Sequence, residues 1–86
     1  MTNRTSDPLL DDRPDEALAV AIVVNGEPRA MPAGSTVGDL LRRHALDSRM
    51  VVVERNRVIL RDRSAFDSLA LESGDVIEIV HFVGGG

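Results

Sequence analysis

The last three residues of the chain, Gly84, Gly85 and Gly86, are the part of the sequence best suited to chemistry. They follow directly on an apolar stretch, VIEIVHFV (76–83), without a polar linker. Glycine has no Cβ, so three extended glycines make a thin strand that reaches roughly 10 Å beyond a domain. Such a strand can carry the carboxylate of Gly86 into a narrow active site on another protein. A frayed tail without function is the alternative interpretation.

The chemistry open to Gly86 is that of a C-terminal carboxylate. Such a group has an ordinary pKa of about 3.3–3.7, so it is ionised at neutral pH and is a poor electrophile. Conversion to an acyl-adenylate supplies a good leaving group, and a sulfur nucleophile can then attack the unhindered carbonyl carbon. The product is a C-terminal thiocarboxylate. The sequence therefore predicts that Gly86 is the modified residue, and that Gly84 and Gly85 are recognised by the partner enzyme.

Other residue types that commonly catalyse reactions lack a catalytic context here. The two histidines, His44 and His81, belong to no metal-binding motif of the H-E-x-x-H kind. The serines show no nucleophile-elbow pattern, and no helix follows the glycines to make a phosphate loop. Asp75 and Glu78 are explained as a turn residue and an exposed strand residue. We therefore expect no intrinsic catalysis, no bound metal and no bound cofactor.

Composition excludes several classes of function. With 86 residues the chain holds one domain at most, and its net charge of −4 argues against a nucleic-acid partner. Two phenylalanines, without tryptophan or tyrosine, make a base-stacking surface improbable. The absence of cysteine excludes disulfides and thiolate metal sites. No signal peptide and no membrane-spanning run is evident, so we expect a cytoplasmic protein without a membrane partner.

The first 18 residues differ from the rest of the chain. Residues 1–18 contain two prolines and five acidic residues against Arg4 and Arg13. Their high negative charge and low apolar content predict a disordered acidic extension. The remainder, residues 19–86, is predicted to be one folded domain that ends in a flexible glycine tail.

A hairpin and a helix open the predicted domain. The segment AVAIVV (19–24) is rich in β-branched residues and ends at Asn25-Gly26, a pair that tolerates positive φ and favours a hairpin with a return strand at 27–31. A helix is then predicted from an N-cap at Thr36 to about Ala45. Asp39 fits a capping box with Thr36. The apolar residues that recur at helical spacing are Val37, Leu40, Leu41 and Ala45.

Three more strands follow. They are predicted at 50–54, 58–60 and 76–83, with a connection at 62–71 that makes a helical turn near Phe66. In the last strand, alternation predicts that Ile77 and Ile79 face the helix together with Leu40, Leu41, Val51 and Val53. Val80 and Phe82 then lie on the opposite, open face, and we predict them as a docking patch for a partner. Packing of Phe82 against the edge of the core is the alternative. One helix laid across a mixed sheet of four to five strands is an α+β arrangement.

Five segments together resemble the ThiS family, the sulfur carriers of thiamine thiazole biosynthesis. In chain order they are VVNGEPR (23–29), GSTVGDLL (34–41), VVVERN (51–56), LESGDVIEIV (71–80) and FVGGG (82–86). They follow the family's order and spacing over nearly all of residues 20–86. Many family members carry a Pro-Arg pair after the fourth strand, and this chain has LRDR at 60–63 instead.

The resemblance implies a ubiquitin-like β-grasp fold and a protein that serves as a cosubstrate rather than as an enzyme. It implies adenylation of Gly86 by a ThiF-like adenylyltransferase that uses ATP. Sulfur would come from a donor such as a cysteine desulfurase, and a ThiG-like thiazole synthase would receive it. Gly85 and Gly86 match the functional diglycine of the family.

Two alternatives remain open at the level of sequence. The same chemistry serves sulfur carriers of other pathways, such as the small subunit of molybdopterin synthase and the carriers of tRNA thiolation, whose endings also hold Gly-Gly. A plain β-grasp interaction module, without chemistry at its tail, is the alternative from a different class.

Overall fold

The computed structural model describes residues 18–82 of the chain. The predicted modified residue Gly86 and the predicted recognition residues Gly84 and Gly85 lie outside this range. Residues 1–17, which make up nearly all of the predicted acidic extension, also lie outside it. Within residues 18–82, no helix is long and apolar enough to cross a membrane.

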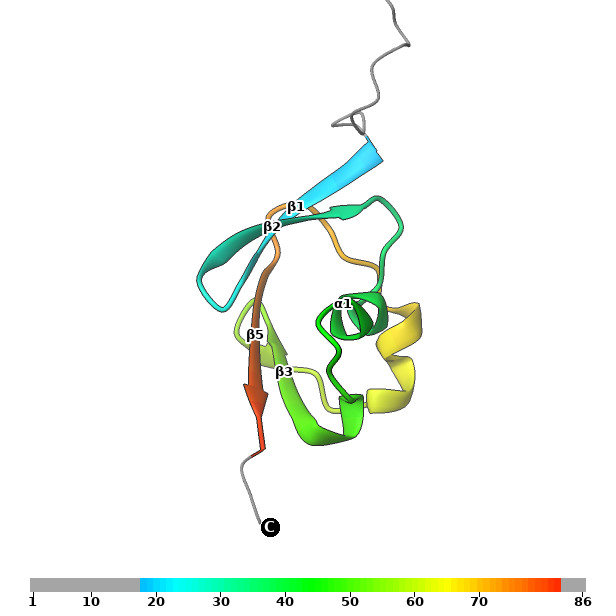
Figure 1. The fold of residues 1–86 in the computed structure, drawn as a ribbon, viewed down its shortest axis with the longest axis vertical. Coiled ribbons are helices and arrows are strands. Elements are labelled where there is room, and N and C mark those ends of the chain that lie inside the picture. Colours follow the sequence, from blue (N-terminus) through cyan, green and yellow to red (C-terminus); the bar gives the residue numbers. More distant parts are fainter. Residues whose placement is uncertain (1–17, 83–86) are drawn as a thin grey trace, which may run out of the picture.

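Five strands form one mixed sheet in the order β2-β1-β5-β3-β4. Their bounds are Ala19–Val24 for β1, Glu27–Pro32 for β2, Val51–Arg55 for β3, Val58–Ile59 for β4 and Val76–His81 for β5. The β1 and β5 strands pair in parallel and the other neighbours pair antiparallel. The helix α1 (Val37–Arg43) lies beside the sheet, and β5 is the central strand of the sheet (Figure 1). This confirms the predicted α+β architecture.

The predicted turn and helix start are both present. Asn25 and Gly26 have φ values of 50° and 84°, the positive angles that a two-residue hairpin loop requires. At the start of α1, the Thr36 hydroxyl accepts a hydrogen bond from the Asp39 N–H at 3.1 Å, and the Asp39 carboxylate accepts one from the Thr36 N–H at 2.9 Å. Asp39 thus completes a capping box despite being shorter than the usual glutamate.

The core lies between α1 and one face of the sheet. Because side chains alternate along a strand, every second residue of β1, β3 and β5 faces the helix. The η3 segment (Arg63–Ser68), a 3₁₀ helix, closes the core with Phe66, which is the helical turn expected there. The buried apolar residues are Ile22, Val24, Met31, Val37, Leu40, Leu41, Val51, Val53, Phe66, Leu71 and Ile77.

Several element boundaries differ from the predicted ones, each for a local reason. The helix ends at Arg43 because Ala45 turns the chain with a φ of 57°. Met50 belongs to η2 (Ser48–Met50), a 3₁₀ helix capped by the Asp47 side chain, so β3 begins one residue later than predicted. The β4 strand stops at Ile59, and β5 stops at His81, so Phe82 lies beyond the strand.

The burial of β5 gives a first prediction about stability. Ile77 is fully buried, whereas Ile79 on the same face is only partly buried and packs at the margin of the core. Ile77→Ala should lower the free energy of unfolding by about 2–5 kcal/mol, as other deletions of buried apolar groups do. Ile79→Ala should cost less, because the removed methyl groups lie partly in solvent.

Urea unfolding of both variants tests this ranking. Val80→Ala serves as the control on the opposite face, where Val80 is 61% exposed. An equal or larger cost at Ile79 would show that this end of β5 packs more tightly than described.

Candidate functional site

The β5 strand is the last element before the three glycines in the sequence, so its supports fix the position of the end of the described chain. It lies between β1 and β3 in the centre of the sheet. Its pairing with β3 extends from the Arg55–Ile77 pair to the Val51–His81 pair, whereas its ladder with β1 ends at the Val24–Ile77 pair. The second half of β5 therefore has a strand partner on one side only.

Two turn asparagines extend the support of β5 where strands do not. The Asn25 side chain accepts a hydrogen bond from the Ile79 N–H at 2.8 Å and donates one to the Ile79 carbonyl at 3.3 Å. The Asn25 side-chain amide thus makes the two hydrogen bonds to β5 that the backbone of a longer β1 would make. Near the start of β5, the Asn56 side-chain oxygen accepts a bond from the Val76 N–H at 2.9 Å.

Asp75, which precedes β5, has a buried carboxylate that bonds to three different residues. One of its oxygens accepts from Asn56 Nδ2 at 3.1 Å; the other pairs with the Arg55 guanidinium at 2.7 Å and accepts from the Glu72 N–H at 2.9 Å. Only 5% of Asp75 is exposed. The expectation that it is merely a turn residue was therefore incomplete, because its side chain points inward and joins the turn to β3.

The environment of Asp75 acts on its pKa in two opposing ways. Burial by itself raises the pKa of the Asp75 carboxyl, since the charged form loses water. The hydrogen bonds from Glu72, Asn56 and Arg55, together with the positive charge of Arg55, outweigh burial and hold the pKa below its ordinary value. Asp75 is thus a charged residue that stabilises the start of β5 through its hydrogen bonds and its ion pair.

The chain leaves the sheet at Phe82. The Phe82 N–H donates to the Met50 carbonyl at 2.8 Å, which holds the backbone one residue past the end of β5. Phe82 is 46% exposed, and the Arg63 guanidinium lies 6.0 Å from the centre of its ring. Phe82 does not belong to the core cluster, so the alternative in which it packs into the core edge is wrong.

The face of the sheet opposite α1 is largely apolar. Val80, as predicted, is exposed there, and register places it directly opposite Val52 of β3. Two carboxylates, Glu54 and Glu78, also lie directly opposite each other on this face. Like charges in such a pair destabilise a sheet by themselves, and a basic group from a partner would relieve the repulsion. The larger aliphatic residues on this face are Val23, Val52, Ile59, Val76 and Val80.

Each of the two histidines lies next to a backbone carbonyl of its own segment. His44 Nδ1 lies 3.1 Å from the Leu40 carbonyl at the end of α1, and His81 Nδ1 lies 3.0 Å from the Phe82 carbonyl. Within residues 18–82, no three histidine, aspartate or glutamate side chains gather in a group that could hold a metal ion.

Sequence reasoning found the exposed Val80 and Phe82 but missed the supports beneath them. The roles of Asn25, Asn56 and Asp75 depend on contacts between residues 19 to 54 positions apart. The available signal was the presence of an Asn or Asp in each turn that flanks a central strand, since such side chains readily bond to the backbone.

The comparisons with known proteins agree on one family. The model of the ThiS family matches residues 22–86. The chain is 47% identical over 51 residues to the sulfur carrier protein ThiS of Bacillus subtilis, an alignment that covers 59% of this chain and 76% of that protein. It is also 46% identical over 65 residues to a thiazole synthase of Paramagnetospirillum magneticum, which covers 76% of this chain. The chain spans only about 20% of the length of that synthase.

Solved structures show the same fold. The crystal structure of a thiamine biosynthesis protein (ThiS) from Geobacter metallireducens superposes with a TM-score of 0.65 and 33% sequence identity. The superposition covers 78% of this chain and 100% of that protein. The solution structure of a thiamine biosynthesis protein from the same organism gives a TM-score of 0.61. The expected ubiquitin-like β-grasp fold is confirmed by these matches.

Proposed function

Since the chain belongs to the ThiS family, we propose that it is a sulfur carrier protein that donates sulfur for thiazole formation in thiamine biosynthesis. The sulfur is carried as a thiocarboxylate on Gly86. The observation that carries the proposal is the family match itself, because it extends from β1 through residue 86 and so includes all three glycines. The name of the B. subtilis relative supports the same role.

The proposed chemistry has two steps, both in partner enzymes. A carboxylate oxygen of Gly86 attacks the α-phosphorus of ATP in a ThiF-like adenylyltransferase, and pyrophosphate leaves. Hydrosulfide, released by a thiol reductant from the persulfide of a donor such as a cysteine desulfurase, then attacks the carbonyl carbon; AMP leaves and the thiocarboxylate remains. The chain contributes the carboxylate and the narrow glycine segment that carries it. Glycines have no side chain that would collide with the walls of a narrow channel. The chain is a cosubstrate in both steps and binds no cofactor of its own.

A ThiG-like thiazole synthase is the proposed acceptor of the sulfur. In two thiazole synthases, from P. magneticum and Magnetococcus marinus, a region similar to this chain makes up about 20% of the polypeptide. Their names support the thiazole branch over the molybdopterin and tRNA-thiolation alternatives. Within this proposal, residues 19–86 form the carrier domain and residues 1–18 are an acidic extension outside it.

Stimulation of ATP–pyrophosphate exchange tests the proposed function. A ThiF-like adenylyltransferase should exchange pyrophosphate into ATP only when this chain is present. A lack of exchange with an adenylyltransferase that is active on its own carrier would contradict the proposal. The interaction-module alternative predicts binding without exchange.

The open face gives a prediction about docking on the adenylyltransferase. Val80→Asp should weaken the affinity at least tenfold, because a carboxylate would be desolvated in an apolar contact that already holds Glu54 and Glu78. Titration calorimetry with the purified adenylyltransferase measures the effect.

Val58→Asp is the matched control. Val58 is 62% exposed, much as Val80 is at 61%, but it lies at the outer edge of the sheet on the side of α1. Its substitution should leave both the affinity and the unfolding midpoint unchanged. Equal affinity of the two variants would remove Val80 from the docking surface.

A further inference from the structure

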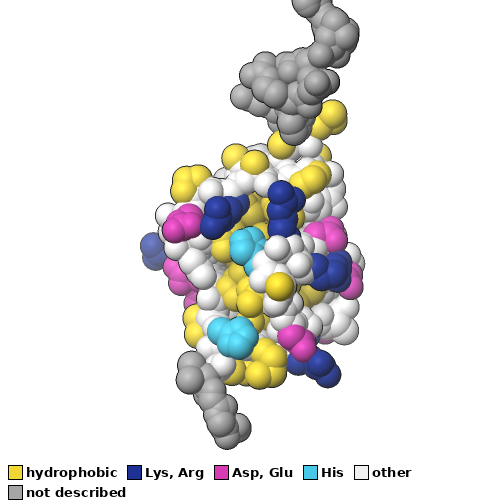
Figure 2. All heavy atoms as spheres, in the orientation of Figure 1, with side chains coloured by type: hydrophobic (Ala, Val, Ile, Leu, Met, Phe, Trp, Pro, Cys, Tyr) yellow, Lys and Arg dark blue, Asp and Glu magenta, His cyan; other side chains and the backbone are white. Residues whose placement is uncertain are grey.

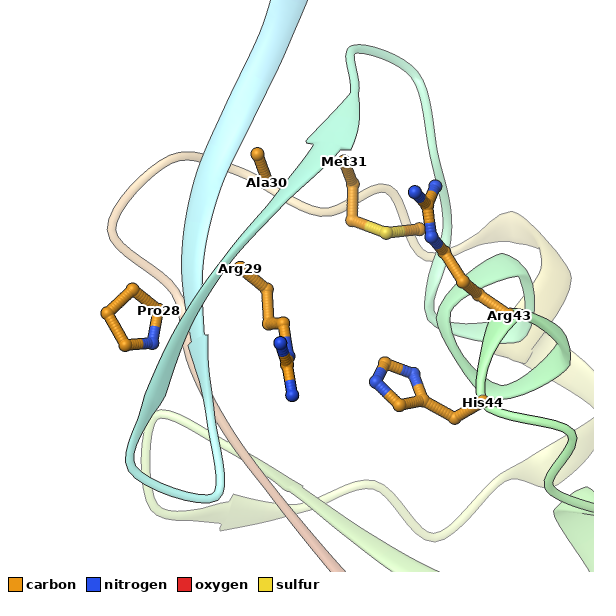
Figure 3. A pocket seen from close by; sticks show the side chains of 6 residues that line it. All are labelled: Pro28, Arg29, Ala30, Met31, Arg43 and His44. Carbon is orange, nitrogen blue, oxygen red and sulfur yellow. The ribbon is translucent and has the colours of Figure 1, made fainter.

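A hollow lies between the edge strand β2 and the end of α1, away from the open face of the sheet. Its volume is about 480 Å³, and the residues that line it are Pro28, Arg29, Ala30, Met31, Arg43 and His44. The side chains of Arg29 and His44 extend toward each other from the strand and from the helix, and Arg43 borders the same space beside Met31 (Figure 3). Basic side chains flank a histidine above hydrophobic side chains on this face of the molecule (Figure 2).

The hollow has an excess of positive charge. Arg29 forms an ion pair with Glu27 at 2.9 Å, and both side chains are substantially exposed. Within residues 18–82, Arg43 takes part in no ion pair, whereas its neighbour Arg42 pairs with two aspartates. Pro28, Ala30 and the nearly buried Met31 supply the smaller, apolar part of the lining. A ligand that combines carboxylates with apolar groups would match this lining.

The edge of β2 disfavours an added β-strand as the occupant. Register and hairpin geometry direct the backbone of Pro28, Ala30 and Pro32 away from β1. The two prolines have no N–H, and the Pro32 carbonyl already accepts a bond from the Ser35 N–H at 3.0 Å. Only Ala30 offers both a donor and an acceptor outward. Prolines at such an edge are a common protection against strand addition, so charge rather than a backbone ladder must hold the occupant.

The chain itself contains a segment with the required chemistry. Residues 7–16 read DPLLDDRPDE, with five acidic residues against Arg13 alone and with the apolar pair Leu9-Leu10. They precede Leu18, whose carbonyl accepts a hydrogen bond from the Ala33 N–H at 2.8 Å, so they join the fold at the end of β1 beside β2.

The chain before Leu18 is also long enough to reach the hollow. Arg29 lies three positions along β2 from Pro32, a distance of roughly 10 Å at about 3.3 Å per residue. A chain that reverses after Leu18 spans this distance with four or five residues, which brings the acidic residues 11–16 level with the hollow. We propose that the acidic segment 7–16 binds in this hollow, with its carboxylates at Arg29 and Arg43.

A nitroxide spin label tests the proposal in the full chain. Because the chain has no cysteine, Ser6→Cys gives a single labelling site next to the segment. The label should broaden the amide NMR signals of Ala30, Met31 and His44 selectively. The broadening should be lost in 1 M salt, where the Debye length is about 3 Å, and in the double variant Arg29→Gln/Arg43→Gln.

The matched control is Arg57→Gln/Arg61→Gln, which removes the same charge from two exposed arginines elsewhere on the fold and should preserve the broadening. Weak, uniform broadening, or selective broadening that survives the Arg29/Arg43 substitutions, would overturn the proposal. Binding between molecules is tested in a mixture of two kinds of chain. One carries the spin label and has nitrogen of natural abundance, and the other is ¹⁵N-enriched and carries no spin label. Broadening of the hollow in that mixture would assign the site to a second copy and would also overturn it.

Discussion

Deletion of Gly86 is expected to abolish adenylation of the chain. The proposed mechanism requires the terminal carboxylate to reach the α-phosphorus of ATP inside a partner enzyme. Removal of one residue draws the carboxylate back by roughly 3.5 Å. Misplacement of a reacting group by about 1 Å can already cost 10²-fold in rate, so a loss of at least this size is predicted. ATP–pyrophosphate exchange with the cognate adenylyltransferase measures the loss.

A second variant separates geometry from chemistry. Addition of one alanine after Gly86 places the carbonyl of Gly86 in an ordinary peptide bond and should also abolish exchange. Neither variant should shift the unfolding midpoint, because all of the described core contacts lie within residues 18–82. Normal exchange by the deletion variant would refute the carrier mechanism, and an interaction module would bind its partner normally in both cases.

Asp75→Ala is expected to have the largest effect on stability. It removes one member of a pair that is mostly buried. The Arg55 guanidinium loses its countercharge and keeps only the Ala70 carbonyl as an acceptor, and the Asn56 amide and the Glu72 N–H lose the carboxylate they bond to. Loss of one partner from a buried ion pair costs about 3–5 kcal/mol. Against a total stability of about 5–15 kcal/mol for a small domain, this is a large fraction. Chemical denaturation followed by circular dichroism measures the change.

Asp67→Ala provides the control. Its carboxylate pairs with Arg42 at 2.9 Å on an exposed surface, where ion pairs contribute little. The loss of stability should therefore be much smaller than at Asp75. Equal losses at the two positions would show that the burial of Asp75 does not set its contribution.

The same carboxylate predicts how stability depends on pH. Because the pKa of Asp75 is lower in the folded protein than in the unfolded chain, its contribution is complete above the unfolded value of about 3.9. The contribution is lost as the pH falls from there through the folded pKa. Between neutral pH and acidic pH the wild type should therefore lose more stability than Asp75→Asn, measured by denaturation at each pH. Parallel pH profiles would contradict this assignment.

The local features of the fold could be predicted from sequence because they depend on neighbouring residues. The Asn25-Gly26 turn requires two positive φ angles, and the capping box requires only Thr36 and Asp39. The alternation of β5 likewise placed Ile77 in the core and Val80 on the open face. Each of these follows from side-chain and backbone chemistry within a few residues.

The features that sequence could not supply are those made by distant segments. The ion pair of Asp75 with Arg55 and the clasp of Asn25 on Ile79 exist only after strands from both halves of the chain have assembled. The hollow between Arg29 and Arg43 likewise depends on how α1 crosses the sheet. The partial exposure of Ile79 follows from its position at the margin of the core, which strand alternation alone does not indicate.

Intact-mass analysis of the chain produced together with its own pathway enzymes tests the central claim most directly. Replacement of one carboxylate oxygen of Gly86 by sulfur should add about 16 Da to the mass of the chain. Fragmentation should place the added mass on the C-terminal glycines, and the variant without Gly86 should lack it. A chain that keeps its unmodified mass while the pathway enzymes are active would contradict the account.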